Sequence, residues 1–135
     1  MGALELFICY KLVDIMKREI KVLAGGCFNK IHPGHIYFLN KAKALGYLVV
    51  VLTHDKNNKK SYAVPAKERK KQITALKIAD DVVIGHPTNY MKTVKKINPD
   101  IIALGYDQEM PKDIKTEAKI VRIRKFRDYS TRKLL

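Results

Sequence analysis

The hydrophobic residues of the chain fall into short apolar runs that alternate with stretches of helical spacing. The runs are rich in β-branched residues, and they predict five strands, at residues 20–24, 48–52, 82–84, 101–104 and 120–123. The stretches between them carry apolar residues three and four positions apart. They predict helices at residues 36–45, 68–78 and 90–97, and a short terminal helix that starts near Ser130.

This alternation predicts an α/β fold, a single doubly wound parallel sheet of five strands with right-handed crossovers. The run at 48–52 is almost wholly apolar, which suits a parallel strand covered on both faces. We expect the domain to span residues 20–135. Residues 1–19 precede the first strand and include Met16, so they are either an N-terminal extension or the result of a start placed too early. Both interpretations stay open.

Ligands of such sheets bind at the carboxyl ends of the strands. Four segments are therefore candidate site segments: 26–35, 54–61, 105–107 and 129–131. The first joins a predicted strand to a predicted helix and reads Gly26-Cys27-Phe28-Asn29-Lys30-Ile31-His32-Pro33-Gly34-His35. Its glycines and the N–H groups at the helix start make a natural anion site, and His32 and His35 can reach one phosphate cluster.

Two alternatives apply to the histidines of this loop. Their spacing also suits metal ligation, but no Glu lies between them and no third ligand of the usual type follows. A helix-capping loop with incidental histidines is the other alternative. The glycines, Pro33 and the strand-to-helix position favour the phosphate interpretation.

Charge narrows the class of ligand. The chain carries 27 Lys and Arg against 13 Asp and Glu, a formal net charge of +14, so its surface should attract polyanions such as nucleotides, phosphorylated metabolites and nucleic acids. Cys9 and Cys27 form no spaced framework, which favours a cytoplasmic location and predicts neither disulfides nor a zinc site. The apolar run at 4–10 is interrupted by Glu5 and is too short to cross a bilayer, so we expect no membrane association.

The loop resembles the Gly-X-Phe-Asp-X-X-His-X-Gly-His signature of the cytidylyltransferase-like nucleotidyltransferase superfamily, with Asn29 in place of the usual Asp. This resemblance implies a Rossmann-like, HUP-type fold. It also implies transfer of a nucleoside monophosphate from ATP or CTP to a phosphate-bearing acceptor, with release of pyrophosphate. A divalent ion, Mg²⁺, would be held mainly by the substrate phosphates, with no protein ligands assigned. The charge lost at Asn29 is expected to alter metal affinity.

The resemblance further implies the residues of the site. The catalytic candidates are expected to bond or neutralise phosphates, and they are His32, His35, Lys59, Lys60 and Arg69. The nucleotide-binding candidates come from the loop, from the end of the fourth strand and from the start of the last helix. They are Gly26, Cys27, Phe28, His32, Pro33, Gly34, His35, Gly105, Asp107, Tyr129, Ser130 and Thr131.

A second stretch of the sequence indicates the acceptor substrate. Residues 99–108 resemble the corresponding segment of archaeal-type FAD synthases, which implies FMN as acceptor and ATP as donor. Glycerol-3-phosphate cytidylyltransferases and the nucleotidyltransferase domains of ADP-heptose synthesis share the loop and stay open as alternatives. A homodimer also stays open, since dimers are common among relatives.

Two hypotheses lie outside this enzyme class. A basic nucleic-acid-binding protein is suggested by the net charge and by Arg122, Arg124, Lys125, Arg127, Arg132 and Lys133, but no nucleic-acid-binding motif is recognisable. A nucleotide-binding regulator without turnover is suggested by Asn29.

Overall fold

The structure, a computed structural model, describes residues 20–126. Its strands are β1 (Lys21–Gly26), β2 (Tyr47–Leu52), β3 (Asp81–Ile84), β4 (Ile101–Leu104) and β5 (Lys119–Arg122). Its helices are α2 (Pro33–Lys43), α3 (Ala66–Ala75) and α4 (Tyr90–Ile97), with a 3₁₀ turn, η1, at Asp55–Asn57. The strands form one sheet in the order β3-β2-β1-β4-β5, and every neighbouring pair is parallel. The predicted five-stranded parallel α/β fold is confirmed.

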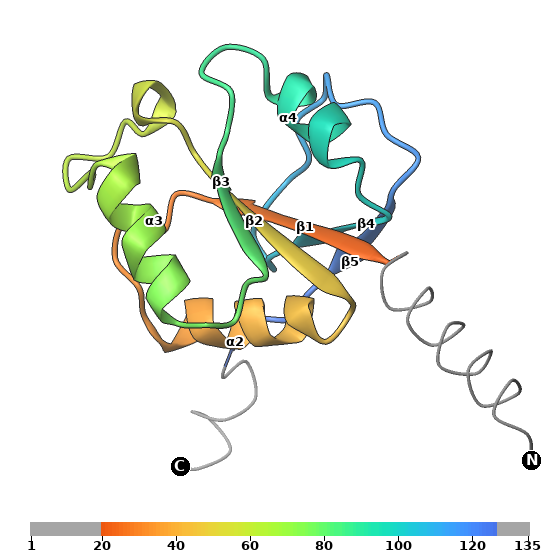
Figure 1. Ribbon diagram of the computed structural model, residues 1–135, viewed down its shortest axis with the longest axis horizontal. Helices are drawn as coiled ribbons and strands as arrows, with labels where there is room; N and C mark the ends of the chain where they lie inside the picture. The colour runs from red at the N-terminus through yellow and green to blue at the C-terminus, as the bar shows by residue number, and fades with distance from the viewer. Residues whose placement is uncertain (1–19, 127–135) are drawn as a thin grey trace, which may run out of the picture.

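Helices cover both faces of the sheet (Figure 1). The side chains of α2 and α3 pack on one face, where Leu39 and Ile73 join a cluster with alternate residues of β1 and β2. The other face packs against α4, through Val94 and Ile97. Residues 48–52 are all buried and contribute to both clusters in alternation, as their apolar run predicted.

Two predicted helices have different bounds in the structure. The first was predicted from residue 36, but α2 begins at Pro33 because the side chains of His32 and His35 cap its N-terminus. The second was predicted to run over 68–78, but α3 ends at Ala75. Lys77 there adopts a φ of 57°, a conformation outside the helical region. The predicted bounds of α4 and β4 match the structure.

The strand order determines where a ligand can bind at the carboxyl edge of the sheet. From β1 the chain passes to α2 on one face, whereas it reaches β4 by way of α4 on the other face. Because β1 and β4 are neighbours, the loops that leave them diverge and open a crevice at their carboxyl ends. No helix within residues 20–126 is long and apolar enough to cross a membrane.

Candidate functional site

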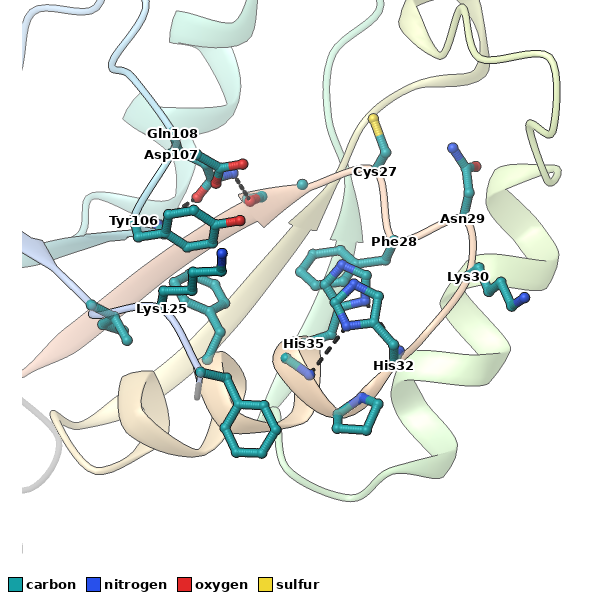
Figure 2. Close-up of a pocket in the computed structure, with 18 of the residues that line it drawn as sticks. Cys27, Phe28, Asn29, Lys30, His32, His35, Tyr106, Asp107, Gln108 and Lys125 are labelled. Carbon is teal, nitrogen blue, oxygen red and sulfur yellow. Dashed lines mark hydrogen bonds between the residues drawn. The ribbon is translucent and has the colours of Figure 1, made fainter. Parts of the chain in front are cut away.

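The two histidines of the loop build a capping box at the start of α2. His32 is the N-cap, and its Nδ1 accepts the N–H of Gly34 at 3.1 Å. His35 reciprocates, since its Nδ1 accepts the N–H of His32 at 3.3 Å. The imidazoles stack with 3.8 Å between ring centroids and lie side by side in Figure 2. A neutral ring whose Nδ1 accepts carries its proton on Nε2, where it can donate. For His35 the Lys30 backbone is a further hydrogen-bond partner.

Burial keeps His35 neutral. Its ring packs edge-on against Phe28, with 5.1 Å between centroids. Burial, and secondarily the charge of His32, lower the pKa of His35 below its usual 6.5. At neutral pH the imidazole is therefore an uncharged hydrogen-bond donor. Phe28 itself holds a φ of 52°, and its ring occupies the space where a side chain at Gly26 would stand, 2.8 Å from that Cβ position.

A cavity of about 1260 Å³ opens in front of these histidines. Its walls are the β1–α2 loop, the turn at residues 105–108 and the segment after β5. Most sequence-predicted residues line it: Gly26, Cys27, Phe28, His32, Pro33, Gly34, His35, Lys60, Gly105 and Asp107. Across from the histidines lie Tyr106 and Lys125, whose Nζ is 5.3 Å from the centre of the Tyr106 ring (Figure 2). The structure thus brings together the loop, one of the two predicted lysines and the end of β4.

Gln108 fixes the turn at 105–108, although the sequence suggested no role for it. Its Nε2 donates to the carbonyl of Gly25 at 2.9 Å, and its Oε1 accepts the N–H of Gly105 at 2.8 Å. From β5, Arg122 donates to the carbonyls of Gly105 at 2.8 Å and Gln108 at 2.6 Å. Arg122, one of the basic residues that suggested nucleic-acid binding, therefore stabilises this turn.

Arg69 does not reach the cavity, which corrects the prediction that it neutralises phosphates. Its side chain is 0% exposed. The guanidinium donates to three backbone carbonyls and one carboxylate: Val64 at 2.7 Å, Cys27 at 2.8 Å, Thr53 at 2.7 Å and Asp55 at 3.0 Å. These acceptors belong to two loops of the functional edge, the β1–α2 loop and both ends of the β2–α3 connection, so Arg69 positions these loops. The N–H of Ala66 and then Arg69 lower the pKa of Asp55.

Asn29 lines the cavity, and its side chain is bonded to a neighbouring loop. Its carboxamide pairs reciprocally with that of Asn58, at 2.9 Å and 2.6 Å, and its oxygen accepts the N–H of Val64 at 3.0 Å. Both asparagines are buried. This pair anchors the loop that carries Lys60 at the cavity wall, whereas Lys59 is exposed and is not among the lining residues. An Asp at position 29 could not donate to Asn58, so the amide has a structural function here.

Several predictions fall outside the described residues. Tyr129, Ser130, Thr131 and the predicted terminal helix lie beyond residue 126, and the N-terminal extension precedes residue 20. Within residues 20–126, no group of three or more His, Cys, Asp and Glu side chains could hold a metal ion. The described part of the larger cavity has a single lining carboxylate, that of Asp107.

A second cavity, of about 400 Å³, lies on the α4 side of the same edge. Its walls include the apolar side chains of Val51, Val94, Ile102, Met110 and Ile114. Its polar lining includes His54, Asn57, His86, Thr88 and Tyr90. Gly25, Gly26 and Gln108 line both cavities, so the two meet at the end of β1. Of this lining, the sequence indicated the segment that starts at His54 but neither His86 nor Tyr90.

Fold and site together define a class: an enzyme that binds a nucleotide at the carboxyl edge of a parallel sheet, a nucleotidyltransferase. A model of the family described as Cytidylyltransferase-like matches residues 23–132. The chain belongs to this family, and the resemblance found in the sequence is confirmed.

The chain is also similar to individual proteins of known name. The chain is 42% identical over 115 residues to the FAD synthase of Ferroglobus placidus, which covers 77% of this chain and 76% of that one. It is 35% identical over 132 residues to the FAD synthase of Methanohalobium evestigatum, with 88% of each chain covered. Among solved structures it is similar to the lipopolysaccharide core biosynthesis protein of Thermoplasma volcanium GSS1. That similarity has a TM-score of 0.71 and 40% identity, over 79% of this chain and 98% of that chain.

Proposed function

We propose that this chain transfers the AMP group of ATP to the phosphate of FMN, forming FAD and pyrophosphate. The observation that carries the proposal is the meeting of two cavities at Gly25 and Gly26, next to the paired histidines. A transfer between two phosphorylated substrates needs such a junction, because the attacking oxygen must approach the phosphorus closely. The FAD synthase relatives support FMN as the acceptor.

The larger cavity, hereafter the nucleotide cavity, takes ATP. The start of α2 and the Nε2–H groups of His32 and His35 offer donors to phosphate oxygens. Lys60, Arg124 and Lys125 line the same cavity and bring positive charge. The triphosphate therefore lies along the β1–α2 loop in this proposal, with its α-phosphate beside the junction.

The smaller cavity, hereafter the acceptor cavity, takes FMN. Its apolar walls between α4 and the segment at 110–114 suit the body of a flat aromatic ring system. The FMN phosphate then lies at the Gly25–Gly26 junction, where a side chain at either glycine would meet Tyr90 or Phe28. Both substrates are thus held with their reacting groups adjacent.

In the proposed reaction, an oxygen of the FMN phosphate attacks the α-phosphorus of ATP. A new P–O bond forms, the bond to the bridging oxygen breaks, and pyrophosphate leaves with that electron pair. The Nε2–H groups of His32 and His35 donate to the α-phosphate oxygens as negative charge develops on them. A bound Mg²⁺ ion would supply further charge neutralisation and would be held mainly by the substrate phosphates; Asp107 is the carboxylate on the described cavity wall.

The proposal is tested by product analysis. Purified protein given ATP, FMN and Mg²⁺ is expected to accumulate FAD and pyrophosphate in equal amounts. His35→Ala is expected to lower kcat by on the order of a hundredfold, since it removes a donor to the transition state. The substitution also removes half of the capping box, so the free energy of unfolding is measured in parallel. It is expected to fall by about 1 kcal/mol. Full activity in His35→Ala would overturn the mechanism.

Alternative substrates form the second arm of this experiment. CTP with glycerol 3-phosphate and ATP with heptose 1-phosphate are offered under the same conditions. The similarity to a lipopolysaccharide core biosynthesis protein makes the heptose pair the relevant competitor. Turnover of either pair, with FMN inert, would retain the nucleotidyltransferase reaction and reject FMN as acceptor.

A further inference from the structure

The acceptor cavity has a pair of histidines of its own. His54 follows β2 and His86 follows β3, and both are partly buried and line this cavity. The Nδ1 atom of His54 accepts the N–H of Lys56 at 3.1 Å. That of His86 accepts the N–H groups of Thr88 at 3.2 Å and Asn89 at 2.9 Å. Neither histidine is used by the reaction described above.

These backbone contacts fix the chemistry of the two rings. A neutral imidazole that accepts at Nδ1 carries its proton on Nε2, so each ring is left with one outward donor. His32 and His35 in the nucleotide cavity are fixed in the same way. The four histidines of the chain thus form two pairs of Nε2–H donors, one pair lining each cavity.

The second pair lies on the β2 and β3 side of the junction. Gly26, Leu52 and Ile84 are in register across β1, β2 and β3, and the histidines follow two residues after the last two. The side chain of Asn57 ties the two loops, donating to the carbonyl of Pro87 at 2.8 Å. With strands about 4.8 Å apart, β3 lies roughly 10 Å from β1. A ligand whose phosphate occupies the junction therefore extends across β2 toward the imidazoles.

Given the proposed function, on which this inference rests, the far end of the ligand is the ring of FMN. An isoalloxazine ring has an apolar dimethylbenzene side and a polar side with two carbonyl oxygens, which need donors. We propose that His54 and His86 select the flavin by donating their Nε2–H groups to the carbonyl edge of this ring. In this pose the ring body contacts Val51 of β2 and Val94 of α4, which line the cavity. An acceptor without such an edge would leave two partly buried donors without a partner on the ligand, which costs affinity.

The test replaces each histidine by asparagine. The carboxamide oxygen of Asn accepts a backbone N–H two residues ahead, so the local turn keeps its cap. Nothing then occupies the position of the Nε2–H group. His54→Asn and His86→Asn therefore separate the donor from the cap, which alanine variants would remove together.

Binding of FMN is measured by quenching of its fluorescence, without ATP. We expect the Kd for FMN to rise about fivefold to tenfold in each Asn variant, as for one lost hydrogen bond. Riboflavin has the same ring without the phosphate, so its Kd is expected to rise by the same factor. In turnover, the KM for FMN should rise by more than the KM for ATP. Lys56→Ala is the matched control, because it changes the neighbouring side chain but keeps the backbone N–H bonded to His54.

Each outcome has a defined meaning. An unchanged Kd for FMN in both Asn variants overturns the inference, and so does a loss seen with FMN but not with riboflavin, which would assign the pair to the phosphate. A loss of the same size in Lys56→Ala would show a general effect of the loop and also reject it. Failure of the wild-type protein to form FAD rejects the proposed function instead, since the binding measurement requires no turnover.

Discussion

At the scale of single residues, Tyr90 and Gly25 form the wall where the two cavities meet. Burial raises the pKa of Tyr90 to about 12, so its hydroxyl is neutral at physiological pH. A Cβ on Gly25 would stand 2.7 Å from this hydroxyl oxygen. The next atoms, the Val51 carbonyl oxygen and Tyr90 Cζ, would be at ordinary distances of 3.6 Å and 3.9 Å. The Tyr90 hydroxyl oxygen is therefore the one atom that a side chain at position 25 would approach too closely.

This geometry predicts a specific rescue. Gly25→Ala is expected to lower the free energy of unfolding by about 1–3 kcal/mol, as overpacked positions do. In a Tyr90→Phe background the obstructing oxygen is gone, and most of that cost should disappear. Urea unfolding of the wild type, both single variants and the double variant measures the coupling. Simple additivity of the two single effects would contradict the proposed contact.

At the scale of elements, Arg69 joins segments that the sheet alone does not connect. The residue belongs to α3, while its acceptors lie in the β1–α2 loop, just after β2 and just before α3. Asn29 and Asn58 add a second tie between the first two of these regions. The loops of the functional edge are thus held together by buried polar contacts, and the substrates meet a largely preformed surface.

Arg69→Lys distinguishes this function from phosphate binding. Lysine keeps the charge but cannot reach four acceptors in the guanidinium geometry, so carbonyls would be left unpaired. We expect a loss of about 3–5 kcal/mol in the free energy of unfolding, typical of a broken buried network. Chemical denaturation without substrate measures it. Unchanged stability combined with weaker ATP binding would restore the phosphate-binding function predicted from the sequence.

At the scale of the whole molecule, the excess of positive charge acts on both substrates. The chain has a formal net charge of +14, and both proposed substrates carry phosphates that meet at one edge of the sheet. A positive crevice raises the local concentration of anions. Lys60, Arg124 and Lys125 line the nucleotide cavity and would focus this effect at the proposed site.

Salt should therefore weaken substrate capture. Raising KCl from about 50 to 300 mM shortens the screening length, so the KM values for ATP and FMN are both expected to increase. Initial rates at constant Mg²⁺ measure this change. Riboflavin has no phosphate, so its Kd should change much less over the same range. Equal salt dependence for riboflavin and FMN would show that the field does not act through the phosphate.

The sequence by itself determined the features that depend on neighbouring residues. Apolar runs placed all five strands to within two residues, because alternating burial in strands and helices leaves a local pattern. The loop from Gly26 to His35 is contiguous, and so is the capping box that fixes its histidines. The prediction that this loop binds anions came from its residue types and its position before a helix.

Only the tertiary structure decided which polar groups face a ligand and which face each other. Arg69 was expected at the phosphates, yet its hydrogen-bond partners are loop groups up to 42 residues away. Asn29 does line the nucleotide cavity, but its side chain also bonds Asn58 and Val64 of another loop. Gln108 reaches Gly25 across 83 residues, and the acceptor cavity collects its lining from four strand ends. Such contacts depend on the order of strands in the sheet, which determines the neighbours of each loop. Hydrophobic periodicity records burial but carries no information about those neighbours.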